Sequence, residues 1–225
     1  MSTKNSLKKY HSPSRRAMRI ISQRVLLKPA TRRVLKITIS GRENLVKIDS
    51  RKPLIIVANH SSHFDAPLIL TSLPREIGTQ VATAAAADYF FAKWWSGKTT
   101  RIFFNTFPVD RDGSGAHRGM TENLLREKVP VLIFPEGTRS RTGEMGEWHT
   151  GAARLAIEHG AQILPISLKG AGAAWPAGEK HWHSGGGRPV VEVVFREIIR
   201  PREHETAEEL TLRIKQAVAR GLARV

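Results

Sequence analysis

The segment PLIIVANHSSHFDAPLILTSL, residues 53–73, decides the fold, because an apolar run leads into a polar cluster and then into a second apolar run. The first run, 53–58, has no polar side chain on either face, which is typical of a strand buried in the middle of a sheet. The second run, 66–73, is expected to form a helix. Two histidines and an aspartate lie between the runs. They follow the carboxyl end of the expected strand, where α/β proteins place functional sites.

Strand-like and helix-like segments alternate on both sides of this stretch. Strands are expected at 34–40, 53–58, 78–87, within 101–113, and at 129–134, 161–168 and 188–195. Helices are expected at 66–73, 88–97, 115–128, 150–160 and 204–222, and a long loop at 170–188. This alternation predicts an α/β fold with a mostly parallel central sheet flanked by helices. We place residues 35–225 in this domain, and residues 1–34 in a basic amphipathic helical segment that precedes it.

The composition narrows the class of protein. The chain has 225 residues, of which 40% are hydrophobic, and this is ample for a folded core. It has no cysteine, which excludes disulfides, iron–sulfur clusters and thiolate zinc sites and suits a reducing compartment. No apolar run approaches the ~18 residues that a membrane-spanning helix needs, and no signal-peptide pattern follows the first lysines. We therefore expect a cytoplasmic protein that does not cross a membrane.

Positive charge is concentrated in the N-terminal quarter. Residues 1–52 carry 15 Lys and Arg against 2 Asp and Glu, whereas the remaining residues carry 21 against 18. A basic segment of this kind binds either an anionic membrane surface or a nucleic acid. Within residues 15–28, one helical stripe is apolar and is surrounded by arginines. The stripe consists of Met18, Ile21 and Val25, with Leu26 beside it.

This amphipathic pattern favours the membrane surface. A nucleic-acid arm would need less apolar material and would gain from aromatic side chains for stacking, whereas Tyr10 is the only aromatic residue here. A basic helix that packs on its own domain is the remaining interpretation. Pro29 is expected to end or kink the helix.

His60 and Asp65 are the candidate catalytic residues. On one regular helix they would lie about 140° apart, so they meet only if His60 stays in the loop and Asp65 opens the helix. There the aspartate would fix the tautomer of the ring and raise the basicity of its other nitrogen. His60 would then be a general base.

Two other interpretations of this cluster are open. In the first, Asn59, Ser61 or Ser62 only caps the helix, and the histidine is incidental. In the second, the histidines and the aspartate of HSSHFD bind zinc, together with His181 and His183. The histidines lack the four-residue spacing of the helical HExxH zinc motif. We expect no metal and no other cofactor.

A second polar cluster follows the next apolar strand. In FPEGTRSR (134–141), Gly137 permits a tight turn. The Arg139 guanidinium offers paired donors suited to a phosphate or a carboxylate. A third cluster, FPVDRDG (107–113), adds a second arginine. The candidate substrate-binding residues are Arg111, Glu136, Gly137, Thr138 and Arg139.

Three common motifs fail on inspection. SGKTT is preceded by Ala92 where a Walker A loop needs a glycine, and GAGAAW has Trp175 where a dinucleotide-binding loop needs its third glycine. No serine stands in the GxSxG frame of the α/β-hydrolases.

Together, the polar clusters resemble the motifs of the 1-acylglycerol-3-phosphate acyltransferase (PlsC-like glycerolipid acyltransferase) family. NHSSHFD is similar to the first motif, which is a histidine, four residues and an aspartate. FPVDR resembles the second motif, FPEGTRS the third, and ILPIS (163–167) the proline-containing fourth. The similarity spans residues 35–200. Two departures are Asn105, where the second motif usually starts with glycine, and Trp148-His149, where many members have Phe-Lys.

The resemblance implies an α/β acyltransferase domain preceded by a membrane-docking segment. His60, oriented by Asp65, would remove the proton from an acceptor hydroxyl as it attacks an acyl thioester, either acyl-CoA or acyl-carrier-protein, without an acyl-enzyme. Arg139 and Arg111 would hold the acceptor phosphate beside the turn at 136–137. The aromatic-rich segment 89–104 is a candidate lining for the acyl chain, although most of its rings are expected in the core.

The resemblance also implies the partners. The expected acceptor is a lysophospholipid, 1-acylglycerol 3-phosphate, and the expected product is phosphatidic acid. Glycerol 3-phosphate, another lysophospholipid and a lyso-aminolipid stay open as acceptors. We expect peripheral association with the inner face of an anionic membrane and no nucleic acid. A non-catalytic membrane-binding protein of the same fold and a metal-dependent hydrolase are the competing classes.

Overall fold

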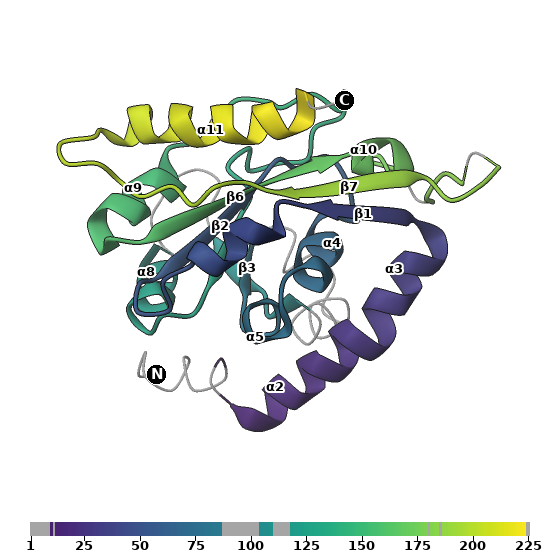
Figure 1. Cartoon of the computed structure of the whole chain (residues 1–225), viewed down its shortest axis with the longest axis horizontal. Coiled ribbons are helices and arrows are strands. Elements are labelled where there is room, and N and C mark those ends of the chain that lie inside the picture. The colour runs from purple at the N-terminus through teal and green to yellow at the C-terminus, as the bar shows by residue number, and fades with distance from the viewer. Residues whose placement is uncertain are drawn as a thin grey trace.

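The computed structural model describes residue 10 and residues 12–86, 104–109, 118–179, 181–184 and 186–223. In these residues the centre is a seven-stranded sheet with the strand order β1-β7-β6-β2-β5-β3-β4 (Figure 1). Neighbouring strands run parallel, except that β6 and β7 are antiparallel. The mostly parallel α/β fold predicted from the alternation of segments is confirmed.

The strands follow the predicted segments closely. They are β1 (Lys36–Ser40), β2 (Leu54–Ala58), β3 (Ala82–Ala86), β4 (Phe107–Val109), β5 (Val131–Ile133), β6 (Gln162–Lys169) and β7 (Val190–Phe195). All residues of β2 are buried, and β2 lies in the middle of the sheet. This confirms the interpretation of the apolar run 53–58.

The helices before, between and after the strands complete the fold. They are α2 (Pro13–Ile20), the π-helix η1 (Ile21–Leu27), α3 (Lys28–Val34), the 3-10 helix η2 (Arg42–Lys47), α4 (Asp65–Ser72), α5 (Arg75–Gly78), α8 (Arg118–Arg126), α9 (Gly151–His159), α10 (Ala171–Ala174) and α11 (Ala207–Ala223). α4, α8, α9 and α11 lie at the predicted positions, and Gly160 ends α9 with a φ of 57°.

Three short helices were not predicted. They are η2, α5 and α10, and α10 lies inside the segment expected to be one long loop. The helix expected at 88–97 falls outside the described residues, and so does the acyl-chain lining expected at 89–104, except for Phe104, which is partly buried and packs against an apolar core cluster.

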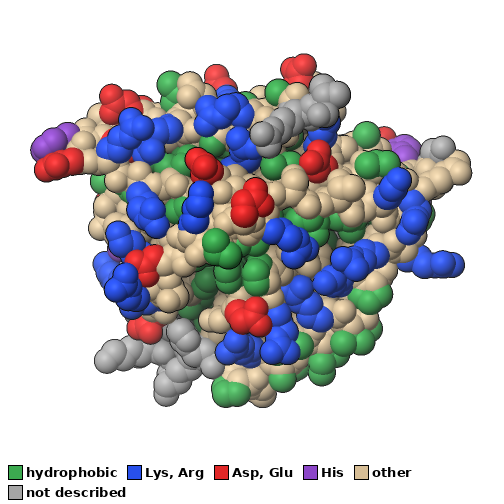
Figure 2. All heavy atoms as spheres, viewed as in Figure 1, with side chains coloured by type: hydrophobic (Ala, Val, Ile, Leu, Met, Phe, Trp, Pro, Cys, Tyr) green, Lys and Arg blue, Asp and Glu red, His purple; other side chains and the backbone are tan. Residues whose placement is uncertain are grey.

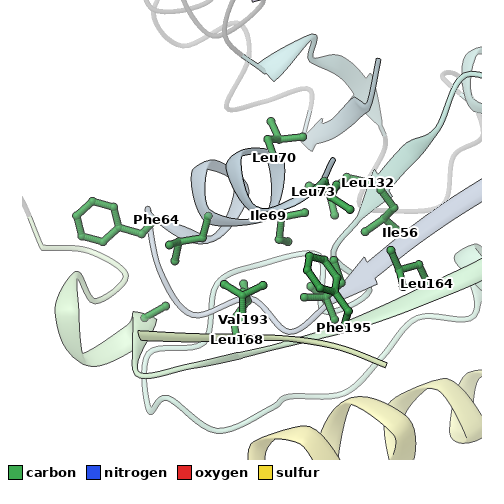
Figure 3. Packing of buried hydrophobic residues seen from close by; sticks show 14 of the residues in the cluster. Ile56, Phe64, Ile69, Leu70, Leu73, Leu132, Leu164, Leu168, Val193 and Phe195 are labelled. Carbon is green, nitrogen blue, oxygen red and sulfur yellow. The ribbon is translucent and has the colours of Figure 1, made fainter. Parts of the chain in front are cut away.

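Helices cover both faces of the sheet and hold β2 from two sides. Leu54, Ile56 and Ala58 join one apolar cluster, whereas Ile55 and Val57 join the other. α4 packs on the first face, as Figure 3 shows for its side chains above those of β2, β5, β6 and β7. α8, α9 and α11 contribute to the cluster on the second face. Burial of apolar surface stabilises the folded state by about 25 cal/mol per Å². The residues that follow the carboxyl end of β2 are therefore attached to a firmly packed strand.

α2, η1 and α3 form one continuous helical segment beside the domain (Figure 1). Of the two outcomes expected at Pro29, an end or a kink of the helix, the end is wrong, because the helix runs on to Val34. Proline lacks an N–H, and its ring presses on the carbonyl four residues earlier. Here the preceding turn is π-helical, and the Lys28 N–H donates to the Gln23 carbonyl five residues earlier. This wider turn makes room for the ring.

The helical segment turns polar side chains towards the domain and apolar ones outward. Its buried residues are Arg19, Ser22, Gln23 and Thr31. The apolar stripe, Met18, Ile21, Val25 and Leu26, is 46% to 61% exposed. Figure 2 shows hydrophobic and basic side chains together on the surface over this segment. Within the residues that the structure describes, no helix combines the length and the apolar character needed to span a bilayer.

Candidate active site

The polar clusters that follow β2 and β5 meet at one edge of the sheet. β2 and β5 are parallel neighbours, so their carboxyl ends point to the same edge. The Ser140 N–H donates to the His60 carbonyl at 2.8 Å. The rings of His60 and Phe134 stack with their centroids 4.0 Å apart. The first and third sequence motifs therefore form one site.

His60 and Asp65 form the hydrogen-bonded pair that their spacing allowed. His60 follows β2, Asp65 is the first residue of α4, and Nδ1 lies 2.7 Å from Oδ2. The same Oδ2 accepts the backbone N–H groups of Ser61 at 2.7 Å and Ser62 at 2.8 Å. The Asp65 side chain is 0% exposed and the imidazole 22%. When Nδ1 donates to Asp65, Nε2 carries the lone pair and is the nitrogen that can accept a proton.

The loop residues beside His60 do not cap α4. The helix begins at Asp65, and its N-cap residue, Phe64, makes no side-chain cap. The Asn59 amide instead bridges the backbone of Leu168, donating to its carbonyl at 3.0 Å and accepting its N–H at 2.8 Å. The Ser62 hydroxyl donates to the Trp175 carbonyl at 2.9 Å. Ser62 Oγ also accepts the Phe64 N–H directly before α4, at 3.1 Å. Because α4 itself has no side-chain cap, the capping interpretation is wrong.

The zinc interpretation can be compared with the positions of the described histidines and carboxylates. Among those residues, no group of three or more His, Asp or Glu side chains has an arrangement that could hold a metal ion. In the HSSHFD cluster, the Nδ1 atom of His60 already contacts the carboxylate of Asp65.

Glu136 links the two loops through their backbones. Its Oε1 accepts the His60 N–H at 2.8 Å, and its Oε2 accepts the Gly146 N–H at 3.1 Å. Hydrogen bonds to an ionised acceptor are among the stronger ones in proteins. Glu136 thus fixes the backbone that carries the imidazole, while its contact with substrate stays a prediction.

The rest of the third motif forms the tight turn expected from its glycine. Gly137 has a φ of 68°, a conformation that favours glycine. A Cβ at this position would lie 3.5 Å from the His149 ring, so the histidine of the Trp148-His149 departure borders the turn. Thr138 is exposed. Arg111 lies outside the described residues, and its part in the site stays a prediction.

Arg139 contacts a residue that the sequence analysis considered only as a zinc ligand. Its Nη1 lies 2.6 Å from each ring nitrogen of His63. The His63 and Trp175 rings have centroids 4.7 Å apart. Burial lowers the pKa of His63, the charges of Arg139 and His60 lower it further, and Asp65 opposes them. No local pattern predicts this contact, because the two residues are 76 positions apart.

The Asn105 departure has a backbone explanation. Asn105 has a φ of 51°, a left-handed conformation that glycine adopts freely and asparagine tolerates better than most residues. Asparagine is therefore one of the few residues that can stand in for glycine in this conformation. The Asn105 Oδ1 also lies 3.5 Å from Nη1 of Arg19, on the N-terminal helical segment.

The site can now be set beside known proteins. A profile of the Acyltransferase family matches residues 36–169, which include both site loops. The chain belongs to the acyltransferase family. The family inferred from the motifs is thus confirmed.

Relatives of known name and one crystal structure are similar to this chain. The chain is 34% identical over 187 residues to a 1-acyl-sn-glycerol-3-phosphate acyltransferase of Chlamydomonas reinhardtii, covering 83% of this chain and 53% of that protein. It is 30% identical over 121 residues to the lyso-ornithine lipid O-acyltransferase of Pseudomonas aeruginosa, covering 52% of this chain and 43% of that protein. The crystal structure of the 1-acyl-sn-glycerophosphate acyltransferase PlsC from Thermotoga maritima matches with a TM-score of 0.71 and 25% identity, over 91% of this chain and 81% of that chain. This chain spans about half the length of the curated relatives it matches.

Proposed function

We propose that this protein is an O-acyltransferase that moves a fatty acyl group from acyl-CoA or acyl-carrier-protein to the free hydroxyl of 1-acylglycerol 3-phosphate, which gives phosphatidic acid. The observation that carries the proposal is the His60–Asp65 pair, with Nδ1 held at 2.7 Å and the ring partly exposed. Arg139 lies in the neighbouring loop, where the acceptor phosphate would bind. The 1-acyl-sn-glycerol-3-phosphate acyltransferases among the relatives support this choice of acceptor.

The reaction uses His60 first as a base and then as an acid. Nε2 takes the proton of the acceptor hydroxyl while the hydroxyl oxygen attacks the thioester carbonyl carbon. The tetrahedral intermediate collapses, the C–S bond breaks, and the imidazolium gives its proton to the leaving thiolate. The Asp65 carboxylate stabilises the imidazolium through Nδ1–H. The chain has no cysteine, and the direct transfer needs no acyl-enzyme.

The phosphate of the acceptor would be bound by arginine. A guanidinium matches the geometry of a phosphate with paired N–H donors, and Arg139 provides one directly after the Gly137 turn. Arg111 would provide a second. Glu136 and Thr138 would complete the pocket, with Glu136 holding the loop and Thr138 offering an exposed hydroxyl.

A lyso-aminolipid is the second candidate acceptor. The similarity to the lyso-ornithine lipid O-acyltransferase of Pseudomonas aeruginosa favours it. The two acceptors can be separated by a competition assay with one acyl-CoA donor, read out by lipid mass spectrometry. Preferential acylation of 1-acylglycerol 3-phosphate supports the main proposal, and preferential acylation of the aminolipid refutes it.

The His60→Ala variant tests the mechanism. Loss of a general base costs ~100- to 10,000-fold in rate, so turnover should fall by that factor while the melting temperature stays unchanged. His204→Asn is the matched control, because it also removes a histidine, but one whose side chain is 92% exposed. Turnover of His60→Ala within a few-fold of wild type would remove His60 from the mechanism.

We also propose that residues 1–34 dock the enzyme on the anionic inner face of a membrane from the cytoplasm. The exposed apolar stripe, Met18, Ile21, Val25 and Leu26, supports this docking, because it would enter the acyl-chain boundary while basic residues meet the headgroups. Membrane docking accounts for the basic charge of this segment, so we propose no nucleic-acid partner.

Two arginines, the buried Arg19 and the half-buried Arg24, hold the segment in the orientation that docking requires. Arg19 Nε donates to the Thr79 carbonyl at 2.7 Å. Arg24 donates to the carbonyls of Thr71 at 3.1 Å and Leu73 at 2.8 Å. Since these bonds fix the polar side of the helix to the domain, the apolar stripe faces away from it.

A further inference from the structure

The contact between Arg139 and His63 joins the two site loops at a point that the proposed chemistry does not use. Arg139 Nη1 is 2.6 Å from the His63 ring nitrogens. Within the part of the chain that the structure describes, Arg139 forms no salt bridge to a carboxylate, so its charge stays available to an anion. A guanidinium has five N–H donors on three nitrogens, and the contact of Nη1 with the His63 ring leaves those of the other nitrogens for a ligand.

The His63 ring is itself held in place from α10. Trp175, directly after α10, lies against His63 at 4.7 Å and meets the Phe64 ring edge-on at 5.1 Å. The Trp175 carbonyl accepts the Ser62 hydroxyl at 2.9 Å. The residues on either side of His63 are therefore tied to the same tryptophan, which limits the directions in which the ring can move.

The charges around His63 favour its neutral form. Burial lowers its pKa most, and the charges of Arg139, on the loop after β5, and of His60, on its own loop, lower it further. Asp65, at the start of α4, acts in the opposite direction, and the Trp175 ring carries no charge. A protonated ring would place a second positive charge against the guanidinium of Arg139. The neutral ring is therefore the form that stays in contact with Arg139.

We propose that His63 is a positioning residue for acceptor recognition, whose ring contacts the Arg139 guanidinium and aims it at the phosphate monoester of the acceptor. This inference rests on the proposed function, since it takes the bound anion to be a glycerol phosphate headgroup. His63 does not touch the reacting atoms. Its removal should therefore affect acceptor binding rather than the transfer step.

Steady-state kinetics of the full chain with 1-acylglycerol 3-phosphate at about pH 8 test the positioning role. His63→Ala should raise the acceptor KM about tenfold, the effect of one hydrogen bond, and leave kcat and the donor KM within about twofold of wild type. His63→Gln keeps a carbonyl acceptor and should restore most of the affinity. His204→Asn is the matched control. An unchanged acceptor KM in His63→Ala, or an equal loss in the donor KM, overturns the proposal.

The pH dependence gives a readout that a purely structural role would not change. Because the neutral ring is the one that holds Arg139, affinity should be lost on the acid side, as pH falls through the lowered pKa of His63. The phosphate also titrates in this range, so the measured quantity is the ratio of the acceptor KM of wild type to that of His63→Gln. The ratio should rise as the pH is lowered, and a flat ratio overturns the proposal.

Binding of glycerol 3-phosphate, measured by calorimetry, tests the same idea without turnover. His63→Ala and Arg139→Ala should each raise Kd about tenfold. The double variant should bind no more weakly than Arg139→Ala alone, because His63 acts through Arg139. Additive losses, or no binding by wild type, overturn the inference.

The two experiments separate this inference from the proposed function. A protein that fails to acylate 1-acylglycerol 3-phosphate, yet shows the non-additive pattern with glycerol 3-phosphate, refutes the function and keeps the role of His63. A protein that acylates this acceptor with additive binding losses does the reverse.

Discussion

The N-terminal helical segment and α11 are both amphipathic in sequence, but they lie in opposite orientations. α11 turns its apolar side to the sheet, where Leu210, Ile214, Ala217 and Val218 are buried. The N-terminal segment, α2 to α3, buries polar residues and exposes its apolar stripe. The two helices lie on opposite sides of the sheet in Figure 1. Helical periodicity shows that a helix has two faces, and it does not show which face turns inward.

The partners available on the domain explain the difference. α11 covers a sheet face that offers apolar side chains. The N-terminal segment instead covers backbone carbonyls near the ends of α4 and α5, which accept hydrogen bonds from Arg24 and Arg19. Buried carbonyls need donors, and arginine supplies several. The apolar stripe is therefore left outside, where only a partner such as a membrane can bury it.

The largest expected effect lies on α11. Ile214→Asp places a carboxylate in an apolar cluster where the native side chain is 2% exposed, and this should cost more than about 4 kcal/mol of unfolding free energy. Leu212→Asp, on the same helix but 58% exposed, should change it by less than about 0.5 kcal/mol. Denaturant unfolding measures both. Equal losses would show that α11 is not oriented as described.

The same change on the exposed stripe should spare the fold and weaken membrane binding. Ile21→Asp combined with Val25→Asp removes two apolar side chains from the docking surface, and burial of each is worth about 1.5–3 kcal/mol. Binding to vesicles that contain anionic lipid should fall about 100-fold or more, with an unchanged melting temperature. Sedimentation with such vesicles measures the affinity. Wild-type binding by the double variant would refute docking through this stripe.

Arg19 tests what holds the stripe outward. Arg19→Ala leaves the Thr79 carbonyl without its donor and should lower the unfolding free energy by about 1.5–3 kcal/mol, because the lost bonds are charge-assisted. Arg15→Ala is the matched control on the exposed side of α2 and should have an effect within about 0.5 kcal/mol. If thermal melts of the two variants coincide, Arg19 is not an anchor.

The smallest effect is that of a single exposed charge. Arg33 is exposed near the end of α3, and Arg33→Gln should weaken binding to anionic vesicles about fivefold. The difference from wild type should disappear in about 1 M salt, where screening acts over ~3 Å. Retention on DNA is measured alongside. If the protein binds DNA more strongly than anionic vesicles, the nucleic-acid interpretation is restored.

The sequence was sufficient to predict those parts of the fold in which the pattern within one segment shows how that segment is buried. Leu54–Ala58 could be placed in the middle of the sheet because a strand without alternation must be buried on both faces. The antiparallel pairing of β6 with β7 could not be predicted, because strand direction depends on how residues 170–189 return to the sheet. α5 and α10 have four residues each, too few to show a helical period.

The contacts in the site also divide into one that the sequence could predict and others that it could not. The contact of His60 with Asp65 could be predicted because both lie in one loop–helix junction, five positions apart. The contacts of Arg139 with His63, and of Glu136 with the His60 backbone, join segments 76 positions apart. They exist only because β5 is inserted beside β2 in the sheet. Local spacing carries no information on that order.

α4 connects the proposed membrane-docking segment to the proposed catalytic pair. Arg24 of the helical segment is bonded to carbonyls at the last turn of α4, and Asp65, which orients His60, is its first residue. α4 has eight residues, so at 1.5 Å per residue it is about 12 Å long. A helix of this length does not stretch. In a docked enzyme, α4 would therefore keep His60 at a fixed distance from the membrane-inserted stripe. Acceptors would be selected by how far their free hydroxyl rises from the bilayer as well as by their headgroup charge.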